Sequence, residues 1–486
     1  MTTLTDPSLF QTSSFINNEW VDHQDDQLEV INPSTNQIIA KVSDSTRSDA
    51  EDAVNAAQKA FKYWSGFTAK ERASVLQKWF QLILENTEDL AKIMTLEQGK
   101  PISEARNEII YGASFIEFYA EECKRVLGNI IPTVDKSRRL FTYKQAIGVV
   151  GCITPWNFPN AMITRKAAPA LAAGCTVVIK PDPKTPLSAL ALCELAKRAG
   201  LPSGVLNVVA GTDSQGIGEV LTQHPYIAKF TFTGSTATGK ILMAQCAKSI
   251  KKVSLELGGN APFIVFNDAN IDEAVEHCIA TKFRNCGQTC VCTNRIYVQN
   301  DVIDNFVSKL KTGISKLKVA DGFDEEATIG PMIDRKAVEK MDSFMLDAKS
   351  NGAAVLLGGK RHALGGFFYE PTLLINTSKN MRILNEEIFG PIAAVESFSS
   401  EEEVIAEANS TNYGLAAYFF TRDIGRVMRL SESLEYGIVC SNSGVFSTEV
   451  APFGGWKQSG IGSEGGKEGI QDFYETKFHS MGGINT

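Results

Sequence analysis

The sequence predicts an α/β protein with two doubly wound parallel-sheet domains and a small additional β element. Length is the first observation behind this prediction, because 486 residues exceed what one hydrophobic core usually serves. The second is that short, almost continuously apolar segments alternate with helical segments, as in parallel sheets covered on both faces. The third is that this alternation occurs in two series, one ending near residue 232 and one beginning near residue 261.

Composition and charge exclude several classes of protein. Apolar residues make up 43% and charged residues 21%, which is typical of a globular chain and not of a disordered one. The net charge of −8 disfavours nucleic acid and anionic membranes as partners. No apolar run is long enough to cross a bilayer, and residues 1–20 lack the pattern of a secretion signal. We therefore expect a cytoplasmic protein whose ten cysteines are reduced, and we expect no metal site because the five histidines lack ligand spacing.

The first part of the chain reads as helical over residues 48–126. Thr68 and Glu71 fit a capping box, and apolar residues follow at helical spacing. Residues 129–145 change character, with a proline and a polar turn before a short apolar run. We expect an extended arm there, which pairs with the extended tail at residues 473–478.

Strands and helices then alternate as the fold class requires. The first series has strands at residues 147–153, 175–179, 205–209 and 230–232, with helices at 164–173, 186–200 and 216–224. The second has strands at 261–266, 295–298, 353–357, 416–421 and 436–440, with helices at 271–283, 301–317, 334–350 and 401–409. The layout is of a nucleotide-binding type.

Two segments carry residues suited to chemistry. In residues 230–239 a strand enters a helix through Gly234 and Ser235, which suits a phosphate held at a helix N-terminus, although a plain capped turn fits equally well. Residues 285–294 form a polar loop with three thiols, and composition cannot choose among them. If that loop is extended, Cys290 and Cys292 point to the same side.

Two further residues are candidates because of their surroundings. Glu256 lies in an apolar strand, where a carboxylate is costly unless it has a partner or a function. Asn157 lies in a rigid turn after a strand, where its amide could stabilise an oxyanion or where the turn could be purely structural.

Together these segments resemble the aldehyde dehydrogenase superfamily. The matching segments occur in family order at residues 155–159 (PWNFP), 180–181 (KP), 232–235 (FTGS), 255–259 (LELGG), 287–290 (GQTC), 387–391 (EIFGP) and 452–455 (PFGG). Within the superfamily, residues 283–295 and 435–439 resemble the succinate-semialdehyde dehydrogenases. The resemblance implies a Rossmann-like cofactor domain at residues 1–128 and 146–256 and a catalytic domain at 257–465. It also implies an oligomerisation arm at 129–145 and 466–486, in a homodimer or homotetramer.

The resemblance also implies a role for each matching residue. Cys290 is the nucleophile, Glu256 the general base, and Asn157 an oxyanion donor beside the Cys290 backbone N–H. The residues implied in binding the nicotinamide cofactor are Trp156, Lys180, Pro183, Gly234, Ser235, Leu257, Glu387 and Phe389. Those implied in binding the distal carboxylate of a semialdehyde are Arg165, Arg284 and Ser447. The subgroup further implies Cys292 as a redox partner of Cys290.

Cofactor and substrate are less sharply defined by the sequence. Pro183 stands where NAD-preferring members often carry a glutamate, which favours NADP, whereas Asp182 would repel a 2′-phosphate; the balance favours NADP over NAD. One methylene changes binding by only about 1–3 kcal/mol, so glutaric semialdehyde or another short carboxylated aldehyde competes with succinic semialdehyde as the substrate. The same residues could also serve a CoA-acylating enzyme, a non-redox cysteine esterase or a non-catalytic protein on the same scaffold.

Overall fold

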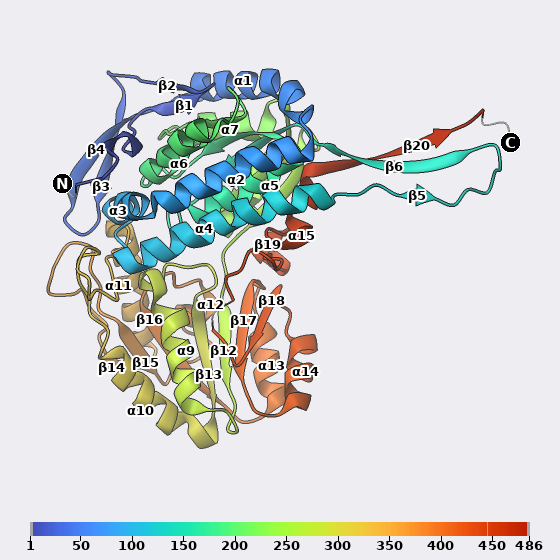
Figure 1. Cartoon of the computed structure of the whole chain (residues 1–486). Coiled ribbons are helices and arrows are strands. Elements are labelled where there is room, and N and C mark those ends of the chain that lie inside the picture. The colour runs from blue at the N-terminus through green and yellow to red at the C-terminus, as the bar shows by residue number, and fades with distance from the viewer. Residues whose placement is uncertain (1–2, 445, 484–486) are drawn as a thin grey trace.

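The computed structural model describes residues 3–444 and 446–483 and contains two large sheets in series (Figure 1). Within these residues, the first sheet has eight strands in the order β19-β11-β10-β7-β8-β9-β1-β2. They are β1 (Ser14–Ile16), β2 (Glu19–Val21), β7 (Val149–Ile153), β8 (Thr176–Lys180), β9 (Leu206–Val208), β10 (Ile227–Thr233), β11 (Lys252–Glu256) and β19 (Gly460–Ile461). The strands from β11 to β9 are parallel, and the outer ones are antiparallel. The α/β prediction is confirmed, while the exact domain boundaries stay a prediction.

Helices cover both faces of this sheet, because its strands are apolar on both sides. Val177 and Ile179 of β8 join one core cluster and Val178 joins the other, which is the period of two expected of a strand. On one face lie α1 (Arg47–Ser65), α7 (Ser214–Gln223) and α8 (Thr236–Ala247). On the other lie α5 (Ala161–Ala173) and α6 (Pro186–Ala199), under an outer layer of α2 (Ala69–Glu85), α3 (Thr87–Gln98) and α4 (Ile102–Glu122). The predicted capping box at Thr68 and Glu71 starts α2. None of the described helices has the length and apolar character that a membrane span would need.

The second sheet has seven strands within the described residues, in the order β14-β15-β16-β13-β12-β17-β18. They are β12 (Ala261–Val265), β13 (Thr293–Gln299), β14 (Ala354–Leu357), β15 (Thr372–Ile375), β16 (Ile392–Phe398), β17 (Ala416–Phe420) and β18 (Ile438–Ser441), parallel except for β14. One face packs against α9 (Ile271–Phe283), α10 (Ile303–Ile314), α11 (Arg335–Ser350) and α12 (Arg382–Asn385). The other face packs against α13 (Glu401–Asn409) and α14 (Ile424–Ser433).

An antiparallel arm projects from the body (Figure 1). It consists of β5 (Ile130–Ile131), β6 (Arg139–Ala146) and β20 (Tyr474–Met481), and β6 pairs with β20 from Ala146–Tyr474 to Arg139–Met481. The tail therefore pairs with the arm as expected. A separate hairpin, β3 (Gln27–Asn32) and β4 (Gln37–Ser43), has no counterpart among the predicted elements. The remaining short helices are Pro7–Leu9, Cys123–Arg125, Arg284–Gly287, Asn300–Val302, Lys457–Ser459, Gly466–Gly469 and Gln471–Phe473.

The order of the strands determines where a ligand can bind at the edge of the first sheet. The chain runs from β7 outward through β8 to β9, then returns to the other side of β7 for β10 and β11. A doubly wound sheet binds its ligand at this point of reversal, beyond the carboxyl ends of the strands. Here these ends lead into Thr154 after β7 and Gly234 after β10. The amino ends of β12 and β13 carry the other half of the candidate site, at residues 259–260 and 290–292.

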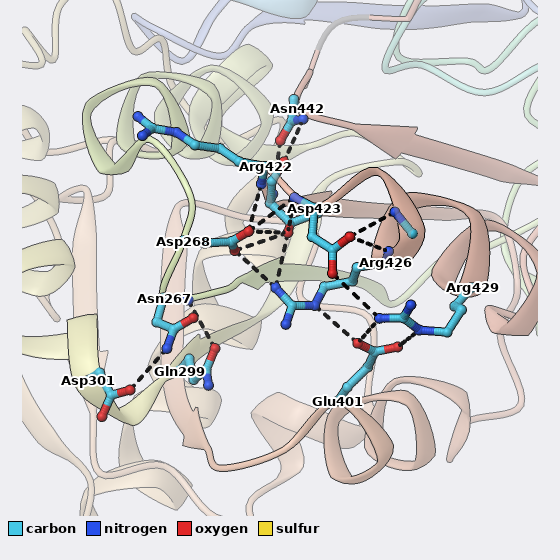
Figure 2. A network of polar contacts seen from close by, with 12 residues as sticks. Asn267, Asp268, Gln299, Asp301, Glu401, Arg422, Asp423, Arg426, Arg429 and Asn442 are labelled. Atoms are coloured by element: carbon cyan, nitrogen blue, oxygen red, sulfur yellow. Dashed lines mark hydrogen bonds and ion pairs between the residues drawn. The ribbon is translucent and has the colours of Figure 1, made fainter.

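The carboxyl edge of the second sheet is closed by polar side chains of the chain itself (Figure 2). Asp268, after β12, accepts hydrogen bonds from Thr421 Oγ1 at 2.8 Å, from the backbone N–H groups of Arg422 and Asp423, and from Arg426 Nη1 at 3.0 Å. Arg426 and Arg429 of α14 also pair with Glu401 at the start of α13. This network occupies the edge at which a parallel sheet would usually bind a ligand.

Candidate active site

The loop that carries Cys290 is shaped by left-handed backbone conformations. Asn285 has a φ of 50° and Gly287 a φ of 73°, between the end of α9 and the start of β13. A Cβ on Gly287 would lie 2.3 Å from the carbonyl oxygen of Gly390, so glycine is required there. Glu104 Oε2 accepts the backbone N–H of Asn285 at 2.8 Å and fixes the loop against α4.

Cys290 is partly exposed, whereas the other nine cysteines, all in the described part of the chain, are buried. It lines a cavity of about 270 Å³ together with Asn157 and Glu387. Burial raises the pKa of the Cys290 thiol to about 12; Arg165 opposes the rise, and Glu387 and Glu256 add to it. Location and exposure thus distinguish Cys290 among the thiols that composition could not rank.

Cys292 follows Cys290 in a turn and not in an extended segment. The condition of an extended loop is not met, because residues 290–291 form a turn and the Cys292 N–H donates to Thr289 O at 3.1 Å. The Cys292 thiol is buried and lies 3.3 Å from Lys282 Nζ. Its role as a redox partner stays a prediction.

Asn157 lies on the cavity wall with its amide directed at the loop of Cys290. Its Nδ2 donates to Gln288 O at 3.0 Å, two residues before Cys290. An amide nitrogen has two N–H groups, so one is left for a ligand. Asn157 is 3% exposed, and its Oδ1 is buried with no hydrogen-bond partner among the described residues.

Glu256 is the last residue of β11 and is almost fully buried. The residue is 2% exposed, and its Oε2 has no hydrogen-bond partner among the described residues. Burial raises the pKa of Glu256 well above its ordinary value, Glu464 adds to the rise, and Arg165 and Lys166 oppose it. A carboxyl group of this kind is a strong proton acceptor once it is ionised.

A buried ion cluster beside Glu256 escaped sequence reasoning. Glu464 pairs with Arg165 Nε at 2.5 Å and with Lys166 Nζ, and both cations lie on α5. The sequence did carry a signal, since Arg165 and Lys166 are the two charged residues of a helix that is otherwise almost entirely apolar. In the structure every residue of α5 is buried, and buried charges of this kind need a partner. Their partner could not be found, because Glu464 is 299 residues from Arg165 in the chain.

A second cavity of about 360 Å³ has the features of a dinucleotide site. The predicted cofactor residues Lys180, Pro183, Gly234 and Ser235 all line it. Ser235 caps α8 by accepting the Thr238 N–H at 3.2 Å, so the helix N-terminus faces the cavity. A Cβ on Gly234 would lie 2.4 Å from the Phe232 ring, so the glycine keeps this approach open. Burial lowers the pKa of Lys180, and Asp182 opposes the change. These residues fit a nucleotide phosphate and ribose.

The two cavities share Trp156, Gly234 and Ser235 and therefore form one groove from Lys180 to Cys290. The predicted residues Leu257, Glu387 and Phe389 line the half nearer to Cys290. The Phe389 and Trp156 rings meet edge to face at 5.6 Å. Glu387 Oε1 accepts the Gly259 N–H at 2.9 Å, and burial raises the pKa of Glu387 to about 7. Lys340, which sequence reasoning missed, also lines this half and donates to Glu387 O.

The three predicted substrate residues lie near one another but differ in their partners. Arg284 Nη1 contacts Ser447 Oγ at 3.4 Å, and Arg284 stacks over the Phe158 ring at 4.8 Å. Arg165 is bound to Glu464, yet its Nη2 is buried with no hydrogen-bond partner among the described residues. Burial raises the pKa of the Tyr111 phenol. Arg165 and Arg284 both oppose this rise, because both guanidinium groups lie close enough to Tyr111 to favour its ionised form.

Comparison with known proteins identifies the family of this chain. The family model for the aldehyde dehydrogenase family matches residues 20–479. The chain is 54% identical to a glutarate-semialdehyde dehydrogenase of Pseudomonas aeruginosa, over 99% of this chain and 100% of the relative. It is also 54% identical to the succinate-semialdehyde dehydrogenase [NADP(+)] of Escherichia coli, over 99% of each chain. A crystal structure of an E. coli NADP-dependent enzyme superposes with a TM-score of 0.98 at 54% identity, over 99% of this chain and 100% of that one. The chain therefore belongs to the aldehyde dehydrogenase family.

Proposed function

We propose that this protein oxidises succinic semialdehyde to succinate with NADP, or with NAD, as its cofactor. The observation that supports an anionic substrate is the buried Nη2 of Arg165, which has no hydrogen-bond partner among the described residues. The charge of Arg165 also opposes the rise in the pKa of the Cys290 thiol. A guanidinium nitrogen whose N–H groups have no partner suits a carboxylate oxygen. The contact between Arg284 and Ser447 supplies a second cationic position. Relatives named for succinate and glutarate semialdehydes support the same class of substrate.

The chain's own residues perform the first steps of the proposed reaction. Cys290 Sγ adds to the aldehyde carbon as a thiolate and forms a thiohemiacetal. The free N–H of the Asn157 amide and the backbone N–H of Cys290 donate to the developing oxyanion. A nicotinamide dinucleotide bound in the groove supplies the hydride acceptor that converts this adduct into a thioester.

Glu256 performs the last step. It takes a proton from the water that hydrolyses the thioester, and burial makes it a stronger base than an ordinary carboxylate. The positive charges of Arg165 and Lys166 favour the ionised form of Glu256, whereas the negative charge of Glu464 opposes it.

The cofactor preference follows from the residues at the end of the groove. Lys180 lies at the carboxyl end of β8, and Pro183 presents no carboxylate to a ribose. Asp182 lies in the same cavity, and the backbone N–H of Lys184 donates to its Oδ1. Asp182 therefore opposes a 2′-phosphate, but Pro183 removes the carboxylate that would compete with it, so we place NADP first and NAD second.

The test is a steady-state comparison of succinic semialdehyde, glutaric semialdehyde and butanal, each with NADP and with NAD. We expect both semialdehydes to exceed butanal in kcat/KM by about tenfold or more, as loss of a charged hydrogen bond implies. Arg284→Met should raise KM for the semialdehydes and leave butanal nearly unchanged, whereas Arg335→Met, at an exposed arginine, should change neither. A kcat/KM for butanal equal to that of the semialdehydes would contradict the proposed anion site. A higher kcat/KM for glutaric semialdehyde would move the assignment to that substrate. Failure of all three aldehydes to reduce the dinucleotide would refute the dehydrogenase assignment.

A further inference from the structure

A buried ion pair contacts the backbone of Asn157, and neither of its residues lines the two cavities of the groove. Lys100, just after α3, pairs with Glu108 of α4, and the two residues are 2% and 4% exposed. The Lys100 ammonium also lies 4.2 Å from the centroid of the Phe158 ring. A buried pair costs desolvation that its attraction rarely exceeds, so stability alone is a weak reason to keep it.

The hydrogen bond from Lys100 to Asn157 gives a better reason for this buried lysine than stability does. Its Nζ donates to the backbone carbonyl of Asn157 at 2.8 Å. Glu108, through its other oxygen, accepts the N–H groups of Asn160 at 2.9 Å and Ala161 at 3.2 Å. The ion pair therefore holds both ends of the short segment that carries Asn157.

The same carbonyl is tied to the catalytic loop. Asn285 Nδ2 donates to Asn157 O at 2.9 Å, and Asn285 Oδ1 accepts from Gln98 Nε2 of α3 at 2.9 Å. Asn157 in turn donates to Gln288 O. Through these contacts α3, the turn after β7 and the loop of Cys290 are held in one arrangement.

We propose that Lys100 is a positioning residue of the reaction. Its hydrogen bond to the backbone carbonyl of Asn157 fixes the Asn157 amide relative to Cys290. This inference rests on the oxyanion role proposed for Asn157. Lys100 touches none of the reacting atoms, so it acts through Asn157 and is not itself catalytic. A misplacement of about 1 Å costs about 100-fold in rate, which is why a rigid support has value at this position.

The test is a double-mutant cycle. We expect Lys100→Met to lower kcat about 10- to 100-fold, with KM for the dinucleotide unchanged. In an Asn157→Ala background the same substitution should lower kcat by less than about twofold, because the group it positions is gone. Lys100→Met/Glu108→Gln, which leaves no unpaired buried charge, serves as the second variant. Lys229→Met, at a lysine that is 1% exposed on β10, is the matched control and should leave kcat unchanged.

A second measurement separates positioning from general damage. Alkylation of Cys290 by iodoacetamide is a displacement at saturated carbon and forms no oxyanion, so its rate should be the same in Lys100→Met as in the parent protein. Equal losses of kcat in both backgrounds would overturn the proposal, as would a matching loss of alkylation rate. Failure of both Lys100 variants to fold, with Lys229→Met folded, would assign the pair to folding and also overturn it. If Asn157→Ala alone retains full turnover, the oxyanion role of Asn157 fails instead.

Discussion

At the scale of the residue, the chemistry depends on the protonation of Cys290. Burial raises the pKa of its thiol to about 12, and the thiolate is the reactive form. Below that pKa the thiolate fraction grows about tenfold per pH unit. We therefore expect the alkylation of Cys290 by iodoacetamide, followed without cofactor by peptide mass mapping, to accelerate about tenfold from pH 7 to 8 and again from 8 to 9.

A neutral substitution at Glu387 tests how charge controls the pKa of the Cys290 thiol, and the neighbouring Glu386 provides the control. The Glu387 carboxylate raises the pKa of the Cys290 thiol, so Glu387→Gln should lower it and speed alkylation at pH 8. Glu386→Gln, at a residue paired with Arg382 on the outer side, should leave the rate unchanged. A pH-independent rate, or an equal gain in the two variants, would contradict this assignment.

Glu256 makes a separate prediction about the order of steps. Glu256→Gln removes the proposed base for hydrolysis and leaves the thiol in place, so the thioester should accumulate. We expect stopped-flow absorbance to show a burst of reduced dinucleotide, with later turnover slower by about 100-fold or more. Because the pKa of Glu256 is raised, steady turnover by the parent protein should increase with pH above the ordinary carboxylate range. A Glu256→Gln protein with neither burst nor slow phase would place the base elsewhere.

At the scale of the element, the Asp268 network makes a stability prediction. Burial would raise the pKa of Asp268, but the hydrogen bonds from Thr421 and Arg422 and the charge of Arg426 lower it overall. Its stabilisation is therefore present above the unfolded pKa and is lost as pH falls through the lowered folded value. Asp268→Asn should cost about 1–3 kcal/mol and lower the thermal midpoint at pH 7 while kcat is unchanged.

The control for Asp268 is another aspartate of the same domain. Asp272 pairs with Lys309 at the surface, where its side chain is 77% exposed, and such pairs contribute little. Asp272→Asn should leave the midpoint where it is. A midpoint equally low in both variants, or a loss that grows as the pH falls, would refute the role given to the network.

The elements also show what a sequence can and cannot reveal. Helix α5 was expected from residue 164 and begins at Ala161, because an apolar run leaves its boundary vague. The hairpin β3–β4 was missed because buried Asn32 and exposed Ile31 blur its alternation. The turn after Cys290 was missed because a polar loop carries no period. The family resemblance, and not spacing alone, singled out Cys290, Glu256 and the residues of the groove, while Lys100 and Glu464 depend on contacts that local pattern cannot show.

At the scale of the whole molecule, the site is assembled from opposite edges of two sheets. The carboxyl ends of β7, β10 and β11 supply the groove and Glu256, and the amino end of β13 supplies Cys290. The usual ligand edge of the second sheet is closed by the Asp268 network (Figure 2). The proposed nucleophile can therefore face the carboxyl edge of the first sheet, and a single groove joins Cys290 to the residues proposed to bind the cofactor.

The arm makes the last prediction, which concerns assembly. Apolar side chains are exposed along it, at Ile130, Ile131, Val134, Tyr143, Phe478 and Met481. An exposed apolar edge strand of this kind suits addition to another subunit's sheet, so we expect light scattering to give the mass of a dimer or a tetramer. Phe478→Lys should lower that mass at micromolar concentration because it places a charge in the buried contact. Leu346→Lys, at a leucine that is 70% exposed on α11, should leave the mass unchanged. A parent protein that scatters as a monomer would mean that the arm has another partner.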